Sequence, residues 1–330
     1  MSNVLLVVVV AVALGFDFTN GFHDTANYVA TWVGTRALSP RLAVLVSAAA
    51  NLAGAFVTTA VAKTVGKGII DTGLATEKTV LAALLGATVW NLLTWWVGLP
   101  SSSTHALIGG LVGAALVQSG SNGVQWHGVW EKVVVPGAIS PAVGFAAAFF
   151  LMVVIYRVFF RASPGVAHRG FRLGQLVTGT WVAFTHGAND AQKTMGVIAL
   201  ALVTHGNISH FYIPTWVKIA AGLTIAAGTY AGGWRIIRTL GQRIYKMQPE
   251  HGLAAQIVAG STLYTGTHFG FPISTTHVVT GSVMGAGAVR GLNAVKWGIA
   301  GNIVVAWLLT MPAAALVSAA IYYPVTWIFG

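Results

Sequence analysis

The sequence predicts an all-α protein that crosses a membrane many times and consists of two similar halves. Of its 330 residues, 55% are hydrophobic and 8% are charged, and the mean hydropathy is +0.74. Such a chain has too few polar side chains to cover the surface of a water-soluble domain. A helix needs about 20 apolar residues to cross a hydrocarbon core of ~30 Å, and on that basis we expect about ten to twelve membrane segments.

Charge and cysteine content exclude several classes of protein. The net charge is +11, but the Lys and Arg residues stand singly between apolar segments and form no stripe with aromatic residues. This pattern argues against a nucleic-acid partner. The chain has no cysteine, so disulfides, thiolate metal sites and a cysteine nucleophile are excluded. We expect no cofactor.

Ten apolar segments follow one another along the chain. In the first half they cover residues 4–34, 41–62, 79–97, 101–118 and 133–160. In the second half they cover residues 173–203, 213–234, 253–268, 273–288 and 297–328. Several are clearly longer or shorter than one membrane crossing, which predicts broken helices and hairpins that meet at mid-membrane.

Two polar motifs each occur twice. FTNGFHDTAN at 18–27 returns as FTHGANDAQK at 184–193, and GLPSSSTH at 98–105 returns as GFPISTTH at 270–277. The shifts, 166 and 172 residues, are nearly equal. We interpret them as an internal duplication, with a first repeat at 1–163, a short basic cytoplasmic linker at 164–172 and a second repeat at 173–330.

The distribution of basic residues predicts the orientation, because Lys and Arg accumulate in cytoplasmic loops. When the connection around 157–172 is placed inside, alternation of the spans puts most basic residues on that side: Arg36, Arg41, Arg157, Arg161, Arg169, Arg172, Arg235, Arg238, Arg243, Lys246, Arg290 and Lys296. Both termini are then extracytoplasmic. Five segments per half is an odd number, so the second half inserts upside down, as in the inverted repeats of secondary transporters.

The first motif places ionisable residues inside apolar segments. A charge there costs several kcal/mol unless a partner or a function retains it, and Asp17, Asp24 and Asp190 are in this position. We expect the helix to break at both copies and to expose backbone groups as an ion site. A polar contact between helices is the alternative. The residues predicted here are the carboxylates of Asp24 and Asp190, with His23 and His186 beside them suiting either a proton relay or a contact between helices.

The second motif suits the start of a helix, where Pro is tolerated and backbone N–H groups lack partners. Such an end attracts anions. We predict that two helix starts surround a tetrahedral oxyanion with Ser102, Ser103, Thr104, Ser274, Thr275 and Thr276, with simple N-capping as the alternative. His105 and His277 follow directly and suit either a proton relay or a contact between helices. Beside carboxylates, hydrogen phosphate can donate a hydrogen bond, whereas sulfate only repels.

Small residues recur at matching positions of the two halves. Gly109 and Gly113 form one GxxxG spacing, and Gly281 and Gly285 form the other. Small residues let membrane helices approach closely. We assign these glycines to packing.

With these motifs the chain resembles the PiT family of inorganic phosphate transporters. The resemblance runs through GFHDTANYVAT at 21–31, THGANDAQKTMG at 185–196 and the two Pro-x-Ser-[Ser/Thr]-Thr-His motifs, and covers essentially the whole chain. It implies a phosphate symporter of the plasma (inner) membrane, driven by protons or sodium, commonly a homodimer and not an enzyme.

The resemblance also carries roles to individual positions. The positions matching the family's phosphate site, with their motif neighbours, are Asp24, Thr25, Ser102, Ser103, Thr104, Asp190, Ala191, Gln192, Ser274, Thr275 and Thr276. The positions matching a sodium site are Asn20, Asp24, Asn27, Asn189 and Asp190. Animal-type members have an Asn where this chain has Lys193, and a fixed ammonium competes with a metal cation. We therefore expect proton coupling first and sodium second.

Other functions stay open at this stage. A permease for sulfate or another oxyanion would share the fold. A passive channel fits an occluding site less well. An intramembrane hydrolase would need a nucleophile or a metal-holding spacing such as H-E-x-x-H, and the sequence has none.

Overall fold

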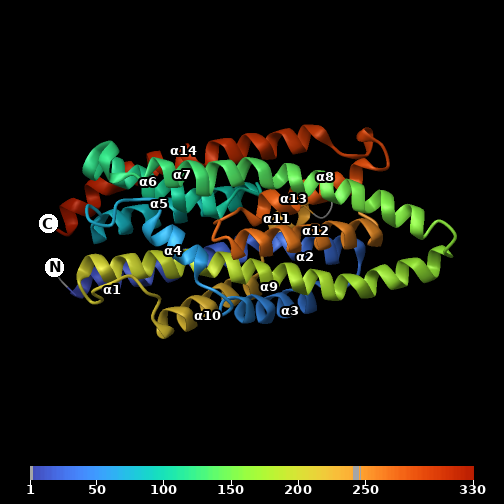
Figure 1. The fold of residues 1–330 in the computed structure, drawn as a ribbon, viewed down its shortest axis with the longest axis horizontal. Helices are drawn as coiled ribbons and strands as arrows, with labels where there is room; N and C mark the ends of the chain where they lie inside the picture. The colour runs from blue at the N-terminus through green and yellow to red at the C-terminus, as the bar shows by residue number, and fades with distance from the viewer. Residues whose placement is uncertain (1–2, 241–244, 246) are drawn as a thin grey trace.

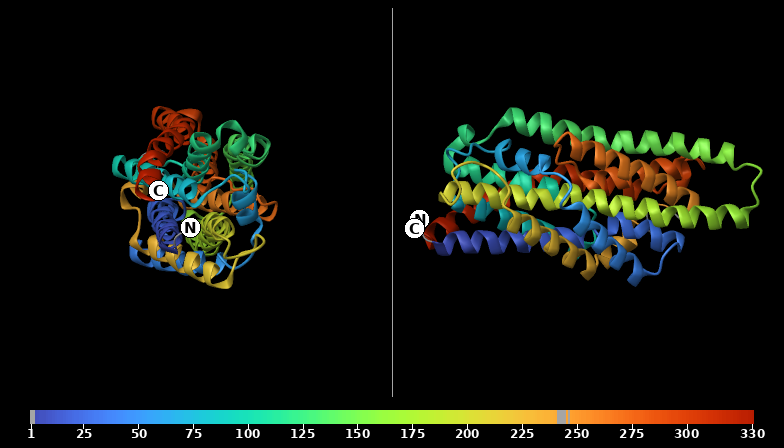
Figure 2. Two further views of the ribbon diagram at one scale, coloured as in Figure 1. Left: turned by 90° about the vertical axis from the view of Figure 1, so that its left-hand side faces the viewer. Right: turned by 60° about the horizontal axis from the view of Figure 1, so that its bottom comes forward.

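The structure, a computed structural model, describes residues 3–240, 245 and 247–330. These residues form an elongated bundle of helices that run mostly along its long axis (Figure 1). Both chain ends lie at the same end of the bundle, and the turn between the two longest neighbouring helices, α8 and α9, lies at the other end (Figure 2). The all-α membrane fold predicted from the sequence is confirmed.

The first half contains, in chain order, α1 (Asn3–Asp24), α2 (Ala26–Thr35), α3 (Pro40–Gly54), α4 (Ala60–Lys67), α5 (Glu77–Val97), α6 (Ser103–Ser119), the short helices η1 (Gly120–Gly123), α7 (Trp126–Val129) and η2 (Trp130–Val134), and α8 (Val135–Val158). The second half contains α9 (Pro164–His205), α10 (Thr215–Ala231), α11 (Trp234–Arg238), α12 (Pro249–His268), α13 (Thr275–Ala288), η4 (Leu292–Ala294) and α14 (Trp297–Ile328). Each half contains a pair of consecutive helices that carries the second motif between them, α5–α6 and α12–α13.

Two helical hairpins, α5–α6 and α12–α13, occupy opposite halves of the bundle, and their tips meet near its middle (Figure 1). Gly98 (φ +76°) ends α5, and Gly270 (φ +73°) lies at the same place in the second hairpin. Glycine adopts this left-handed conformation without steric cost, so each chain can turn sharply. Each returning helix is then capped by a serine, Ser102 or Ser274, whose side chain accepts from the backbone N–H three residues on.

The hairpins pack against the opposite half of the chain. α6 packs on α14, and α13 packs on α8. A Cβ on Gly109 would collide with the Met311 carbonyl, and one on Gly281 would collide with the Pro141 carbonyl. The packing role predicted for the GxxxG spacings is confirmed, because these helices touch backbone to backbone.

We expect Gly281→Ala to destabilise the protein by about 1–3 kcal/mol, because α13 would have to move away from α8. Gly15→Ala is the matched control, since a Cβ at that helical position meets nothing within 4 Å. Thermal unfolding of the purified proteins in detergent measures the effect. Equal unfolding temperatures for the two variants would contradict it.

A polar layer separates two apolar clusters along the bundle. On α1 and α2, the residues from Leu5 to Phe16 belong to one cluster and those from Ala26 to Trp32 to the other. On α9, buried apolar residues within 191–202 belong to the same cluster as Leu5 to Phe16, and residues 182–183 belong to the same cluster as Ala26 to Trp32. The stretches between them carry the duplicated Asp motif and lie beside the hairpin tips, so the fold brings both copies to one level.

The helix break expected at the second Asp motif is wrong, because α9 runs without interruption through Asp190. At the first motif α1 ends at Asp24 and α2 begins at Ala26, while Thr25 between them keeps helical backbone angles (φ −48°, ψ −33°) with its N–H 3.1 Å from the Gly21 carbonyl. Side chains satisfy the Asp190 carboxylate, as described below, so α9 need not open. Wider interruptions lie at 55–59, between α3 and α4, and at 232–233, between α10 and α11.

Two further expectations differ from the structure. Residues 164–172 are the first turns of α9 rather than a linker, because Pro164 suits the first helical position, and the turn lies at 159–163. By length and composition alone, four stretches among the described residues can cross a membrane: Asn3–Thr35, Glu77–Val97, Trp126–Val158 and Trp297–Ile328. The other expected segments include the short helices that flank the interruptions and the hairpin tips. Arg243 and Lys246, used for the orientation, lie outside the described residues.

Candidate functional site

The two motif aspartates meet in the polar layer. Asp24 is 3% exposed and Asp190 is 0% exposed. Ligand atoms of Asp24, His186 and Asp190 all lie within 4.8 Å of one another. The duplication predicted that Asp24 and Asp190 meet, and the structure shows that they do. Spacing along the sequence could not reveal this group of three, because α1 and α9 each supply part of it.

Each carboxylate has its own partners. Asp24 Oδ1 lies 2.8 Å from His23 Nδ1 and 3.4 Å from the Ser103 hydroxyl, which donates to it. Asp190 Oδ1 lies 2.7 Å from the ammonium of Lys193 and 3.4 Å from the Thr275 hydroxyl. Asp190 Oδ2 accepts from the Asn20 amide at 3.1 Å. Both aspartates are therefore connected to the first residue of a hairpin helix.

Two further contacts cross between the halves. The Asn27 amide donates to the Thr276 hydroxyl at 3.1 Å, and the Lys193 ammonium donates to the Thr104 hydroxyl. Asn27 and Lys193 hold the same place in the two copies of the first motif, and Thr104 and Thr276 hold the same place in the second. The two contacts are therefore equivalent in the two halves, but the donor is the Lys193 ammonium in one and the Asn27 amide in the other.

His186 lies between the carboxylates, and the sequence left it open between a proton relay and a contact between helices. Its Nδ1 is 2.7 Å from Asn51 Oδ1, and the Asn51 amide donates elsewhere, so Nδ1 carries the proton in this bond. Its Nε2 lies 3.6 Å from Asp190 Oδ2 and 3.8 Å from Asp24 Oδ2. A proton or a metal cation at this place would relieve the repulsion between the two carboxylates. The i, i+4 spacing to Asp190 was the available signal.

Three predicted residues do not join this cluster. The Thr25 hydroxyl donates to the Gly21 and Thr229 carbonyls, 2.6 and 3.2 Å away, on the side of α10. Gln192 Oε1 accepts from Val61 N at 2.9 Å and so caps α4. Ala191 belongs to an apolar cluster. Residues directly next to an Asp on a helix point to other faces, which explains their absence.

The remaining predicted residues support the hairpin tips. Asn189 donates to the Thr267 hydroxyl at 2.8 Å and to the Phe271 carbonyl at 3.1 Å, while His23 Nε2 lies 3.1 Å from the Thr94 hydroxyl. The rings of His105 and His277 are 4.7 Å apart. Ser102 and Ser274 act as N-caps, so capping, the alternative reading, describes these two.

The site can hold an anion and positive charge together. The starts of α6 and α13 converge with the hydroxyls of Ser103, Thr104, Thr275 and Thr276, all no more than 2% exposed. The first N–H groups of a helix have no partner within the helix, and its dipole is positive there, so both starts favour an anion. The adjacent carboxylates favour a cation or a protonated anion.

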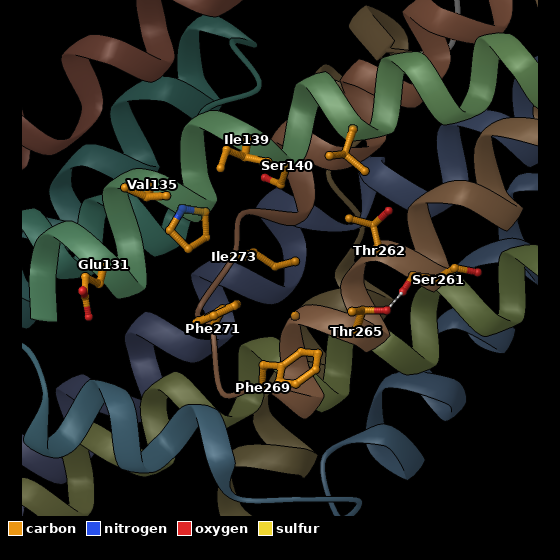
Figure 3. Close-up of a pocket in the computed structure, with 13 residues that line it drawn as sticks. Glu131, Val135, Ile139, Ser140, Ser261, Thr262, Thr265, Phe269, Phe271 and Ile273 are labelled. Atoms are coloured by element: carbon orange, nitrogen blue, oxygen red, sulfur yellow. Dashed lines mark hydrogen bonds between the residues drawn. The ribbon is translucent and has the colours of Figure 1, made fainter.

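The cavity in Figure 3 is a separate feature. It has a volume of about 440 Å³ and lies between α8 and α12, with Ile139, Ser140, Thr265 and Phe269 among its lining residues. Neither Asp24 nor Asp190 lines it. Ile273 does, and its carbonyl accepts from Thr104 at 3.4 Å, so one hairpin tip separates this cavity from the polar layer.

A polytopic helical bundle in which two hairpin tips meet buried carboxylates is typical of a membrane transporter. The chain belongs to the phosphate transporter family, whose sequence model matches residues 20–169 and 162–318. The family is one of transporters, and the chain is not an enzyme, as the sequence predicted.

Individual relatives agree with this assignment. A probable low-affinity inorganic phosphate transporter of Rhizobium meliloti is 49% identical over 97% of this chain and 96% of its own length. Proteins of the same description are 48% identical in Mycobacterium bovis, over 99% of this chain and 79% of the relative, and 40% identical in Bacillus subtilis, over 99% and 98%. A solved structure described as the sodium-dependent phosphate transporter superposes with a TM-score of 0.90 at 26% identity, covering 98% of this chain and 100% of that chain.

Proposed function

We propose that this protein is a secondary active symporter that imports inorganic phosphate across the plasma membrane by alternating access, coupled to protons. The observation that carries the choice of proton is Lys193, whose ammonium lies 2.7 Å from Asp190 Oδ1. The matching place in the other half holds the Asn27 amide, a neutral group. Asp190 therefore already has a cation from the protein itself and does not need sodium for charge balance.

Coupling is expected on energetic grounds. Moving a doubly charged anion inward against 100 mV costs about 4.6 kcal/mol, so net import needs co-transported positive charge or a proton-loaded anion. His23 and His186, both beside Asp24, provide further places for a proton. Sodium is the second choice, since the solved structure is described as sodium-dependent.

We also infer that the two halves are inverted repeats, with the boundary in the turn at 159–163. Matched contacts support this: Asn27 to Thr276 and Lys193 to Thr104, and Gly281 to Pro141 and Gly109 to Met311. The orientation with both termini outside rests on the basic residues, and the homodimer rests on the family resemblance.

Uptake of labelled phosphate by proteoliposomes tests the coupling. With membrane voltage clamped, we expect an inward proton gradient to drive accumulation, and a sodium gradient at equal pH to leave uptake at the level of protein-free liposomes. Excess unlabelled sulfate should not compete. Uptake driven by sodium alone would contradict proton coupling, and competition by sulfate would indicate a broader oxyanion permease.

A further inference from the structure

Asp17 is a buried carboxyl group that the phosphate site does not use. It lies on α1 and is 0% exposed. Its Oδ1 accepts a hydrogen bond of 2.9 Å from the Thr194 hydroxyl on α9. Its Oδ2 has no hydrogen-bond partner among the described residues, and no ion pair of the described chain includes Asp17. This environment differs from those of Asp24 and Asp190, which have histidine, lysine or amide partners.

The surroundings of Asp17 favour a neutral carboxyl group. An ionised carboxylate buried with a single neutral donor costs several kcal/mol, so the group takes up a proton instead. On α9, Lys193 and Asp190 act on Asp17 at longer range and with opposite sign. The other helices packed on α1 carry these ionisable groups: Tyr28 on α2, Glu77 and Lys78 at the start of α5, His105 on α6, and Lys218 and Tyr230 on α10.

The position of Asp17 connects it to the transported anion. Seven residues separate Asp17 from Asp24, about two turns, so both lie on one face of α1 and about 10 Å apart along its axis. Its donor Thr194 directly follows Lys193, the partner of Asp190. A change in the charge of Asp17 would therefore be felt at Lys193 and Asp190 without any contact between Asp17 and phosphate.

We propose that Asp17 binds the coupling proton of the transport cycle, at a site separate from the phosphate. This inference rests on the proposed proton symport, and it names Asp17 as the residue that carries the proton. The carboxylate takes a proton from water on the extracytoplasmic side, forming an O–H bond. That bond breaks when the proton is released to water on the cytoplasmic side, and nothing is oxidised or reduced. A neutral Asp17 belongs to the loaded protein, and an ionised Asp17 belongs to the empty protein as it returns.

Asp17→Asn separates this role from a structural one. Asparagine keeps the oxygen that accepts from Thr194 and resembles the protonated carboxyl group, but it cannot release a proton. We expect exchange of external labelled phosphate for internal phosphate, at equal pH, to stay within about twofold of the unsubstituted protein, and proton-driven accumulation to fall at least about tenfold. Alkalinisation of the external medium during uptake should disappear. Asp71→Asn, in the loop between α4 and α5, is the matched control and should change neither activity.

Two results would overturn the proposal. One is normal accumulation with normal proton flux in Asp17→Asn. The other is loss of exchange in a variant that thermal unfolding shows to be folded, because Asp17 would then act in phosphate binding. Failure of the proposed function looks different: the unsubstituted protein itself would accumulate phosphate on a sodium gradient and not on a proton gradient.

The variant Thr194→Val tests the same proposal if the Asp17→Asn protein does not fold. It removes the hydroxyl that donates to the carboxylate and leaves the carboxyl group in place. Because a hydrogen bond to the charged form favours that form, its loss should shift the pH of half-maximal proton-driven uptake upward by about one unit. An unchanged pH profile would overturn the proposal.

Discussion

Asparagine in place of Asp24 or Asp190 is expected to abolish phosphate uptake. Either change removes a buried negative charge at the level where the two hairpin tips meet. In Asp24→Asn, the new amide can still accept from Ser103, so we expect a folded protein whose uptake falls at least about 100-fold. In Asp190→Asn, the Lys193 ammonium loses its partner, and leaving such a charge buried costs about 3–5 kcal/mol.

Labelled phosphate uptake in proteoliposomes, normalised to the amount of inserted protein, measures this loss. Thermal unfolding in detergent separates lost activity from lost stability, and we expect only Asp190→Asn to unfold at a clearly lower temperature. Asp71→Asn again provides a carboxylate change outside the polar layer. Uptake near that of the unsubstituted protein in either variant would remove that carboxylate from the mechanism.

Lys193→Asn is expected to convert the protein from sodium-independent to sodium-dependent uptake. The change gives the second half the residue type found at Asn27 in the first half and leaves Asp190 without its fixed cation. A sodium ion can then take the place of the ammonium beside the carboxylate and the Thr104 hydroxyl. Without sodium, we expect uptake to fall at least about tenfold.

Sodium should also raise the unfolding temperature of Lys193→Asn and leave that of the unsubstituted protein unchanged, because a ligand stabilises the state that binds it. Lys193→Met is the control, since its side chain neither carries charge nor leaves a polar space, and it should be inactive with or without sodium. Equal uptake by Lys193→Asn with and without sodium would contradict a role for the ammonium in ion selection.

The internal duplication made the centre of the site predictable. Because the motifs recur at nearly constant shifts, Asp24 and Asp190 had to occupy equivalent places, and the hairpin tips at 98–105 and 270–277 had to do the same. The structure places them together. A repeat in the sequence shows which residues of the two halves are equivalent. If a two-fold axis relates the halves, equivalent residues that lie at this axis come into contact.

The local backbone and the individual contacts were less accessible from the sequence. Breaks were expected at both Asp motifs, but Asn20 and Lys193 satisfy the Asp190 carboxylate and α9 continues through the second copy. Gln192 was placed in the phosphate site by its sequence neighbourhood, whereas its helical face directs it to α4. The pair of Asp17 with Thr194 depends on a distance between α1 and α9, which no spacing along the chain encodes.

The exchange of packing partners between the halves has a mechanical consequence. Each hairpin is braced by the last long helix of the other half, with glycine positions set directly against carbonyl groups. Contacts of this kind tolerate little sliding, because a small displacement along the helix replaces a glycine by a larger residue. A hairpin that moves away from the centre must therefore either move together with the long helix of the other half or lose the packing contact with it. Opening of the site on one side of the bilayer is thus coupled to movement of the other half of the chain.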